Sequence, residues 1–183
     1  MRLISITLAA MLALAACSPG ASQESTGAAS SQEARSVHPV SGLSVIDLTV
    51  AGDSGSHKFR VEVAASDAEQ ARGLMFRTQM GPDEGMLFPK DPPERAAFWM
   101  KNTVIPLDII FVGRDGRILN IENAVPYDET PVPAAGLAAA VLELNGGRAA
   151  ELGIVPGDKV SWKLADKPRR SGGNPLGTRG EGG

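Results

Sequence analysis

The chain has 183 residues, enough for one folded domain with additional segments at its ends. Its formal net charge of -3 at pH 7 argues against a nucleic-acid-binding protein, because such proteins usually carry a basic face. It contains 2 histidines and 1 cysteine, and this scarcity limits the catalytic and metal-binding chemistry available to it.

The first element in chain order is a short apolar segment that ends at the sole cysteine. Arg2 precedes an apolar run over residues 3–16, and the last four residues of the element are Leu-Ala-Ala-Cys, with the cysteine at position 17. Such a segment has the form of a secretory signal and is too short to span a bilayer comfortably. Its last four residues resemble the lipobox of bacterial lipoproteins, in which the cysteine is diacylated and becomes the new N-terminus.

We therefore expect residues 1–16 to be a lipoprotein signal peptide and Cys17 to carry the lipid. Several acyl chains on one residue give durable membrane anchoring. Ser18 follows the cysteine and is not acidic, so the resemblance to sorted lipoproteins implies the periplasmic face of the outer membrane, with the inner membrane as the alternative. An ordinary cleaved signal with an incidental cysteine is the other interpretation.

Residues 17–42 and residues 166–183 are predicted to be disordered. The first segment is rich in Ser, Ala, Gly, Gln and Glu without apolar periodicity, which is typical of a flexible tether. The second is rich in glycine and carries scattered arginine. The folded domain is therefore expected over residues 43–165.

The expected domain has the short apolar runs, separated by turn residues, that are typical of a mainly β fold. Phe59, Val61 and Val63 alternate with polar residues, as in a strand with one wet face. Residues 107–112 are apolar except for Asp108, which predicts a central strand buried on both faces. With further short runs bounded by turn residues, about eight strands are expected, in a compact β-sandwich or barrel.

One short α-helix is predicted near residues 67–72. Ser66 is a suitable N-cap, and Glu69 stands three residues later, as a capping box requires. Gly73 follows as the residue that ends the helix.

Several sequence motifs of this domain resemble those of a known family. They are QARGLMFR from residue 70, GMLF from 85, FWMKNT from 98, PLDIIF from 106, VLEL from 141, and GI and GD at 153 and 157. In this order and spacing they resemble the bacterial and archaeal family called domain of unknown function 192 (DUF192), from about residue 59 to residue 164. The resemblance implies a small β-rich, jelly-roll-like domain that is often secreted or lipid-anchored, and it implies no established activity.

The residue types present disfavour several catalytic chemistries. A zinc site needs at least three protein ligands, and the expected domain offers His57 as its only histidine. A Ser-His-Asp triad would depend on that same residue, and acylation would remove Cys17 from catalysis. No glycine-rich phosphate loop precedes a helix. We therefore expect no metal and no cofactor, and a binding protein rather than an enzyme.

Five polar residues in the motifs that resemble the DUF192 family form a candidate ligand-binding cluster: Arg72, Lys101, Asn102, Asp108 and Glu143. A carboxylate inside a strand costs several kcal/mol unless it is paired, so the two acidic residues are expected to have cationic partners, with Arg77 as a further candidate. In the functional interpretation the cations bind an anionic or polyol ligand and the carboxylates orient it. An internal ion-pair network, solvent-facing strand residues and, for Asn102, a local Asx-turn are the alternatives.

The sequence thus favours a monomeric, lipid-anchored envelope protein that binds an unknown envelope ligand or protein. One alternative is a glycan hydrolase that uses Asp108 and Glu143 as general acid and base. Another is a protein-interaction module, which a large exposed apolar patch would favour. Trp99 and Met100 are expected in the core, and an exposed Trp99 beside Lys101 would instead favour a sugar-stacking platform.

Overall fold

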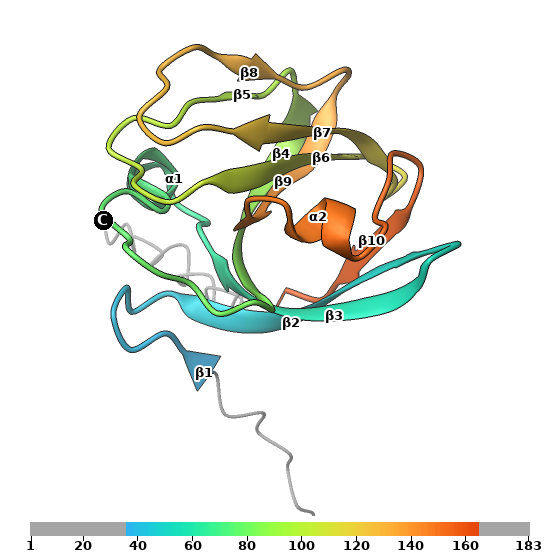
Figure 1. The fold of residues 1–183 in the computed structure, drawn as a ribbon, viewed down its shortest axis with the longest axis horizontal. Helices are drawn as coiled ribbons and strands as arrows, with labels where there is room; N and C mark the ends of the chain where they lie inside the picture. Colours follow the sequence, from blue (N-terminus) through green and yellow to red (C-terminus); the bar gives the residue numbers. More distant parts are fainter. Residues whose placement is uncertain (1–35, 165–183) are drawn as a thin grey trace, which may run out of the picture. The chain divides into compact units, whose positions relative to one another are not determined.

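The computed structural model describes residues 36–164 of the chain (Figure 1). In chain order the elements are β1 (Ser36–Val37), β2 (Ser44–Gly52), β3 (Gly55–Val63), α1 (Asp67–Arg72), β4 (Glu84–Glu94), β5 (Ala97–Phe98), β6 (Leu107–Gly113), β7 (Ile118–Ala124), β8 (Val132–Pro133), β9 (Ala138–Asn145), α2 (Arg148–Glu151) and β10 (Lys159–Trp162). The mainly β fold is confirmed, and the structure contains a second short helix, α2, in addition to the predicted one.

Eight strands form one mixed sheet in the order β1-β2-β3-β4-β9-β6-β7, with β10 paired to β2. β1 and β10 share one edge of β2, and β3 occupies the other. The pairing of β3 with β4 is parallel, which requires a crossover, and α1 lies in that crossover. β5 and β8 form a separate two-stranded sheet.

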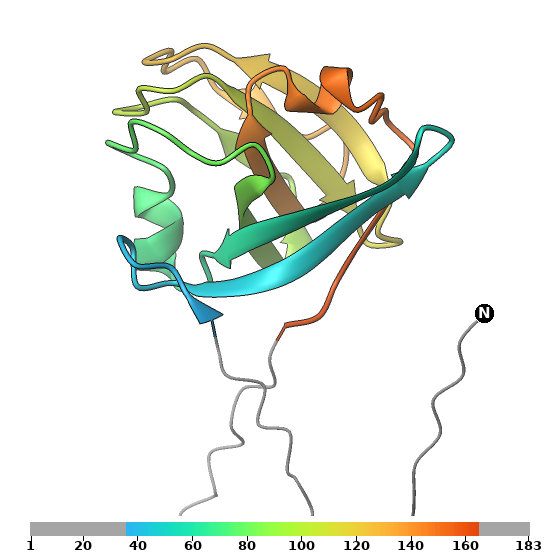
Figure 2. The ribbon, with the colours of Figure 1, turned by 60° about the horizontal axis from the view of Figure 1, so that its bottom comes forward.

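The large sheet curls back on itself, as Figures 1 and 2 show. β10 pairs with β2 and also meets the turn before β7, where the Val160 amide donates to the Gly116 carbonyl at 2.8 Å. Within the described residues, β10 and the start of β7 share an isolated bridge between Arg117 and Lys159 rather than a ladder. The sheet therefore stays open and does not close into a barrel.

Each face of the sheet packs a core of its own, because alternate residues of a strand point to opposite faces. The inner core, inside the curl, contains Leu48, Val50, Phe59, Val61, Leu87, Ile110, Val112, Ile118, Ala140, Leu142, Leu144, Ala149, Ile154 and Val160. The outer core contains Ala64, Leu74, Met86, Phe88, Ala96, Met100, Leu107, Ile109, Phe111, Ala124, Ala134, Ala138 and Val141. All seven residues of β6 are buried, which confirms the predicted central strand.

The helix α1 spans the predicted residues and has the predicted cap. The Ser66 hydroxyl accepts a hydrogen bond from the Glu69 amide at 3.4 Å, and the Glu69 carboxylate accepts one from the Ser66 amide at 2.7 Å. The hydrogen bond from the Ser66 amide is the largest cause that holds the pKa of the Glu69 carboxyl below its usual value. Gly73 ends the helix with a φ of 46°, a conformation that favours glycine.

The described residues begin inside the segment predicted as a tether. β1 pairs with β2 through Ser36 and Val45, so residues 36–42 belong to the fold. Both ends of the described segment lie on the same side, at the bottom of Figure 2, opposite β5 and β8. The predicted signal peptide, Cys17, the rest of the tether and the tail 166–183 lie outside the described residues. In the part that is described, no helix is long and apolar enough to cross a membrane.

Candidate functional site

Three loops come together on the left side of the molecule in Figure 1. They are residues 73–83 between α1 and β4, residues 99–106 between β5 and β6, and residues 125–131 between β7 and β8. The second and third are joined by main-chain hydrogen bonds, among them one from the Met100 amide to the Asp128 carbonyl at 2.8 Å. We call these loops together the three-loop site.

Each loop holds one residue other than glycine in a left-handed backbone conformation, which is uncommon for such residues. Phe76, Asn102 and Tyr127 have φ values of 63°, 54° and 64°. The Phe76 amide donates to the Asn102 carbonyl at 2.8 Å, and the Tyr127 amide donates to the Thr103 carbonyl at 3.2 Å. Such conformations cost free energy and cluster at functional sites, where the surrounding structure maintains them.

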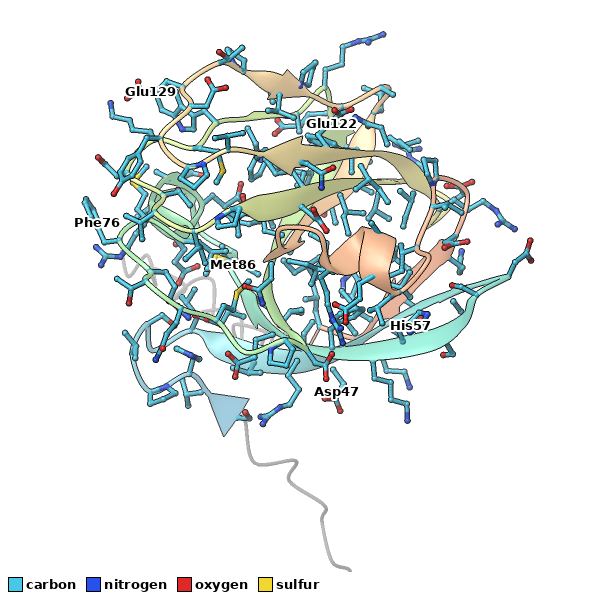
Figure 3. All side chains as sticks on the ribbon, in the orientation of Figure 1. Asp47, His57, Phe76, Met86, Glu122 and Glu129 are labelled. Carbon is cyan, nitrogen blue, oxygen red and sulfur yellow. The ribbon has the colours of Figure 1, made fainter. Side chains whose placement is uncertain are left out.

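The three-loop site exposes three aromatic side chains. Phe76, Trp99 and Tyr127 are 62%, 48% and 63% exposed, and Figure 3 shows Phe76 at the edge of the molecule on this side. The Lys101 ammonium lies 5.1 Å from the centre of the Trp99 ring, in cation–π contact. The prediction that Trp99 lies in the core is wrong, whereas Met100 is buried as expected. The strand alternation assumed there ends early, because β5 stops at Phe98.

A cavity of about 940 Å³ adjoins the three-loop site, and most of its first loop, including Phe76, lines the cavity wall. It lies between residues 38–43, α1 and the first loop, and Arg72 lies on its wall. Within residues 36–164 the side chain of Arg72 forms no ion pair. A cavity of this size is typical of small-molecule sites.

Asp108 has a structural role at the start of α2. It is fully buried, and its carboxylate accepts hydrogen bonds from the backbone amides of Gly147 at 2.8 Å and Ala149 at 2.7 Å. The Asn123 side-chain amide is its third donor. The expected cationic partner is therefore replaced by three neutral N–H donors.

Glu143 has no such partners. It is 5% exposed, and within the described residues its carboxyl group takes part in no hydrogen bond or ion pair. Burial raises its pKa to about 8. Glu143 pairs with Ile109 of the outer core and Asp108 pairs with Leu144 of the inner core, so the two carboxyl groups point to opposite faces of the sheet. This arrangement gives no support to an acid–base pair.

The structure contains a buried ionic cluster that the sequence does not indicate. Glu62 is 4% exposed and pairs with Arg77, whose Nη1 lies 2.8 Å from its Oε1. The Ser41 hydroxyl donates to the same carboxylate, and His38 Nδ1 lies 3.7 Å away. The strand pattern places Glu62 on the polar face, and nothing in it indicates that residues 38–41 fold over that position.

The family to which the chain belongs follows from a comparison with known proteins. The model of the DUF192 family, described as "Uncharacterized ACR", matches residues 48–162. The chain belongs to the DUF192 family. No curated protein matches it.

Two crystal structures resemble this DUF192 domain. A protein of unknown function from Novosphingobium aromaticivorans is 66% identical, with a TM-score of 0.69, and the match covers 69% of this chain and 91% of that one. A putative transcription regulator from Sinorhizobium meliloti is 40% identical, with a TM-score of 0.63, and the match covers 66% of this chain and 95% of that one.

The DUF192 domain brings only some of the five predicted site residues together. Lys101 and Asn102 lie in the three-loop site, and Arg72 lies in the adjoining cavity. Asp108 is on the other face of the sheet, and Glu143 is buried on the near face. Phe76 and Tyr127 are not among the five predicted residues, and no local sequence signal indicates their left-handed conformations. In residues 36–164 no three His, Cys, Asp or Glu side chains gather as metal ligands do.

Proposed function

We propose that this DUF192 protein is a lipid-anchored envelope module that binds an acidic glycan at the three-loop site without transforming it. The observation that carries the proposal is the half-exposed Trp99 ring beside the Lys101 ammonium. An aromatic ring with one exposed face can stack on the apolar C–H face of a sugar, while its polar edge stays in water. The Lys101 ammonium over the ring supplies a cation that can bind a carboxylate on the sugar.

The neighbouring residues extend this recognition surface. Tyr127 adds a second exposed ring, and Asn102 directs its side-chain amide toward the Met75 sulfur at 3.9 Å rather than into an Asx-turn. Arg72 supplies a second cation, on the wall of the cavity that Phe76 also lines. Two cations separated by aromatic rings suit a chain of sugars that carries acidic groups, such as a peptidoglycan fragment.

The location proposed for this module is the periplasmic face of the outer membrane, held by lipid on Cys17. The lipobox-like residues 14–17 support it. Both ends of the described segment lie on the side away from β5 and β8 (Figure 2). The proposed module acts as a monomer.

Trp99 is also the reporter for the test. The chain has two tryptophans, so a Trp162→Phe variant leaves Trp99 as its only indole. We expect a disaccharide of N-acetylglucosamine and N-acetylmuramic acid to change its fluorescence. Trp99→Ala, followed by calorimetry, should weaken binding about tenfold or more, as loss of a central aromatic contact does. The proposal is wrong if no fragment binds the wild type, or if Trp99→Ala binds as well as the wild type.

The anchor is tested separately. The wild type should sediment with membranes and carry lipid at residue 17 by mass spectrometry, and Cys17→Ala should be released. Continued sedimentation of that variant would contradict the lipid anchor and leave the glycan proposal intact.

A protein-interaction module is the second candidate. The observation that favours it is the group of exposed apolar side chains Phe76, Val125 and Tyr127 in the three-loop site. Loss of binding to an envelope protein in Phe76→Ser and Tyr127→Ser, without any glycan binding by the wild type, would favour this candidate.

A further inference from the structure

Glu143 is a buried carboxyl group surrounded by apolar side chains. In the sheet it stands between Met86 of β4 and Ile109 of β6, and both neighbours belong to the outer core. A carboxyl group in such surroundings is costly unless it is bonded. Its neighbour Met86, labelled in Figure 3, lies on the side of the sheet that faces α1 and Phe76.

The Glu143 carboxyl group nevertheless reaches solvent. Among the described residues, Arg148 Nε is the one fully buried side-chain polar atom without a hydrogen-bond partner. The oxygens of Glu143 have no partner among residues 36–164 either, and 5% of the residue's surface remains exposed. Glu143 is therefore an unpartnered polar side chain, more than nine-tenths buried, that faces outward from the sheet.

Two loops of the three-loop site cover the face of the sheet that carries Glu143. Asn145, two residues along β9 on the same face, donates through its side-chain amide to the Gly81 carbonyl at 2.8 Å, so the loop 73–83 covers this face. Leu74 from the same loop and Met100 from the loop 99–106 are buried in the outer core with Met86. The two loops that carry Phe76 and Trp99 thus form the cover over Glu143.

We propose that Glu143 is the buried hydrogen-bonding group of the ligand site and that it binds a sugar hydroxyl inserted between the loops 73–83 and 99–106. The proposal rests on the function proposed above and names the ligand group that is bound deepest. A hydroxyl both donates and accepts, so it can satisfy a protonated or an ionised carboxyl. A site with an unpartnered buried acceptor also discriminates strongly against ligands that lack the hydroxyl.

Asp108 provides the contrast that separates a ligand-binding role from a structural one. Both carboxyl groups are buried in the central strands, but Asp108 has three N–H donors from its own chain. Removal of Asp108 leaves buried donors unpaired and should destabilise the fold. Removal of Glu143 leaves no protein group unpaired and removes a desolvated carboxyl, so it should stabilise the fold.

The experiment measures thermal midpoint and ligand affinity in the full chain with the Trp162→Phe reporter. The variants are Glu143→Gln, Glu143→Met and the control Asp108→Asn, and the probe is the disaccharide of N-acetylglucosamine and N-acetylmuramic acid. We expect both Glu143 variants to raise the midpoint and Asp108→Asn to lower it. Glu143→Met should bind the probe about tenfold more weakly, the loss expected for an unmade buried hydrogen bond, and Glu143→Gln should be affected less.

The outcomes distinguish this proposal from the function on which it rests. If Trp99→Ala weakens binding and Glu143→Met does not, the role of Glu143 is overturned and the glycan site stands. If the wild type does not bind the probe, both proposals fail. A lower midpoint in both Glu143 variants would show that the residue is structural and would also overturn the inference.

Discussion

At the scale of single residues, the two carboxyl groups in the central strands show how differently burial can be compensated. Asp108 is fully buried and accepts two backbone hydrogen bonds at 2.7 and 2.8 Å. Glu143 is 5% exposed, has no partner among the described residues, and has its pKa raised by desolvation to about 8. Desolvation without a bonding partner favours the protonated form of Glu143.

This difference predicts a pH dependence of stability. The folded state binds the Glu143 proton more tightly than the unfolded state, whose pKa for this group is near 4.5. The contribution of this proton to the free energy of unfolding is therefore fully present below the unfolded pKa. It is lost as the pH rises toward about 8. The thermal midpoint of the wild type should fall between pH 5 and pH 8 relative to that of Glu143→Gln, which lacks the titrating group. Parallel midpoint curves for the two proteins would contradict the raised pKa.

At the scale of elements, the loops differ from the strands in what determines them. The strands follow from side-chain alternation, and α1 follows from Ser66 and Glu69 at the spacing of a capping box. The loops depend on contacts distant in sequence, such as the hydrogen bond from the Phe76 amide to the Asn102 carbonyl. The left-handed conformations of Phe76 and Tyr127 have no local signal, since neither residue type favours them.

Asn102 tests whether a loop residue acts through its backbone or its side chain. It has a φ of 54°, which glycine adopts freely and alanine adopts at a cost of about 1 kcal/mol. Asn102→Ala should lower the thermal midpoint, and Asn102→Gly should not, because glycine restores the backbone. If the amide contacts the glycan, both variants weaken binding. If Asn102 only shapes the loop, Asn102→Gly binds like the wild type. A stability loss in Asn102→Gly as large as that in Asn102→Ala would contradict the backbone role.

At the scale of the whole molecule, the sequence predicts the β-rich fold better than it predicts the site. The apolar run of β6 and the cap of α1 are local patterns, and the structure confirms both. The site depends on which loops meet, so the sequence indicates Arg72, Lys101 and Asn102 through the segments that resemble the family but gives no indication of Phe76. Residues 36–42 were assigned to the tether by composition, although His38 and Ser41 contact the buried Glu62.

The charge of the whole molecule bears on the last prediction. The formal net charge is -3 at pH 7, so an acidic glycan gains no attraction from the molecule as a whole. Its binding must depend on local cations, and Lys101 and Arg72 lie in and beside the three-loop site. At ionic strengths near 0.15 M, charges more than about 8 Å from a bound group are largely screened.

We therefore expect the double variant Arg72→Gln, Lys101→Gln to bind the N-acetylmuramic acid disaccharide about tenfold more weakly, a loss of about 1.4 kcal/mol. A neutral chitotetraose, which lacks the carboxylate, should bind both proteins equally. Arg114→Gln removes an exposed charge from the turn between β6 and β7 and is the matched control, which should change neither affinity. Calorimetry at 50 and 300 mM salt completes the comparison, because screening should reduce the difference between wild type and double variant. Equal loss for the acidic and the neutral sugar would show that these side chains act by contact area rather than by charge, and the acidic specificity of the proposed site would be wrong.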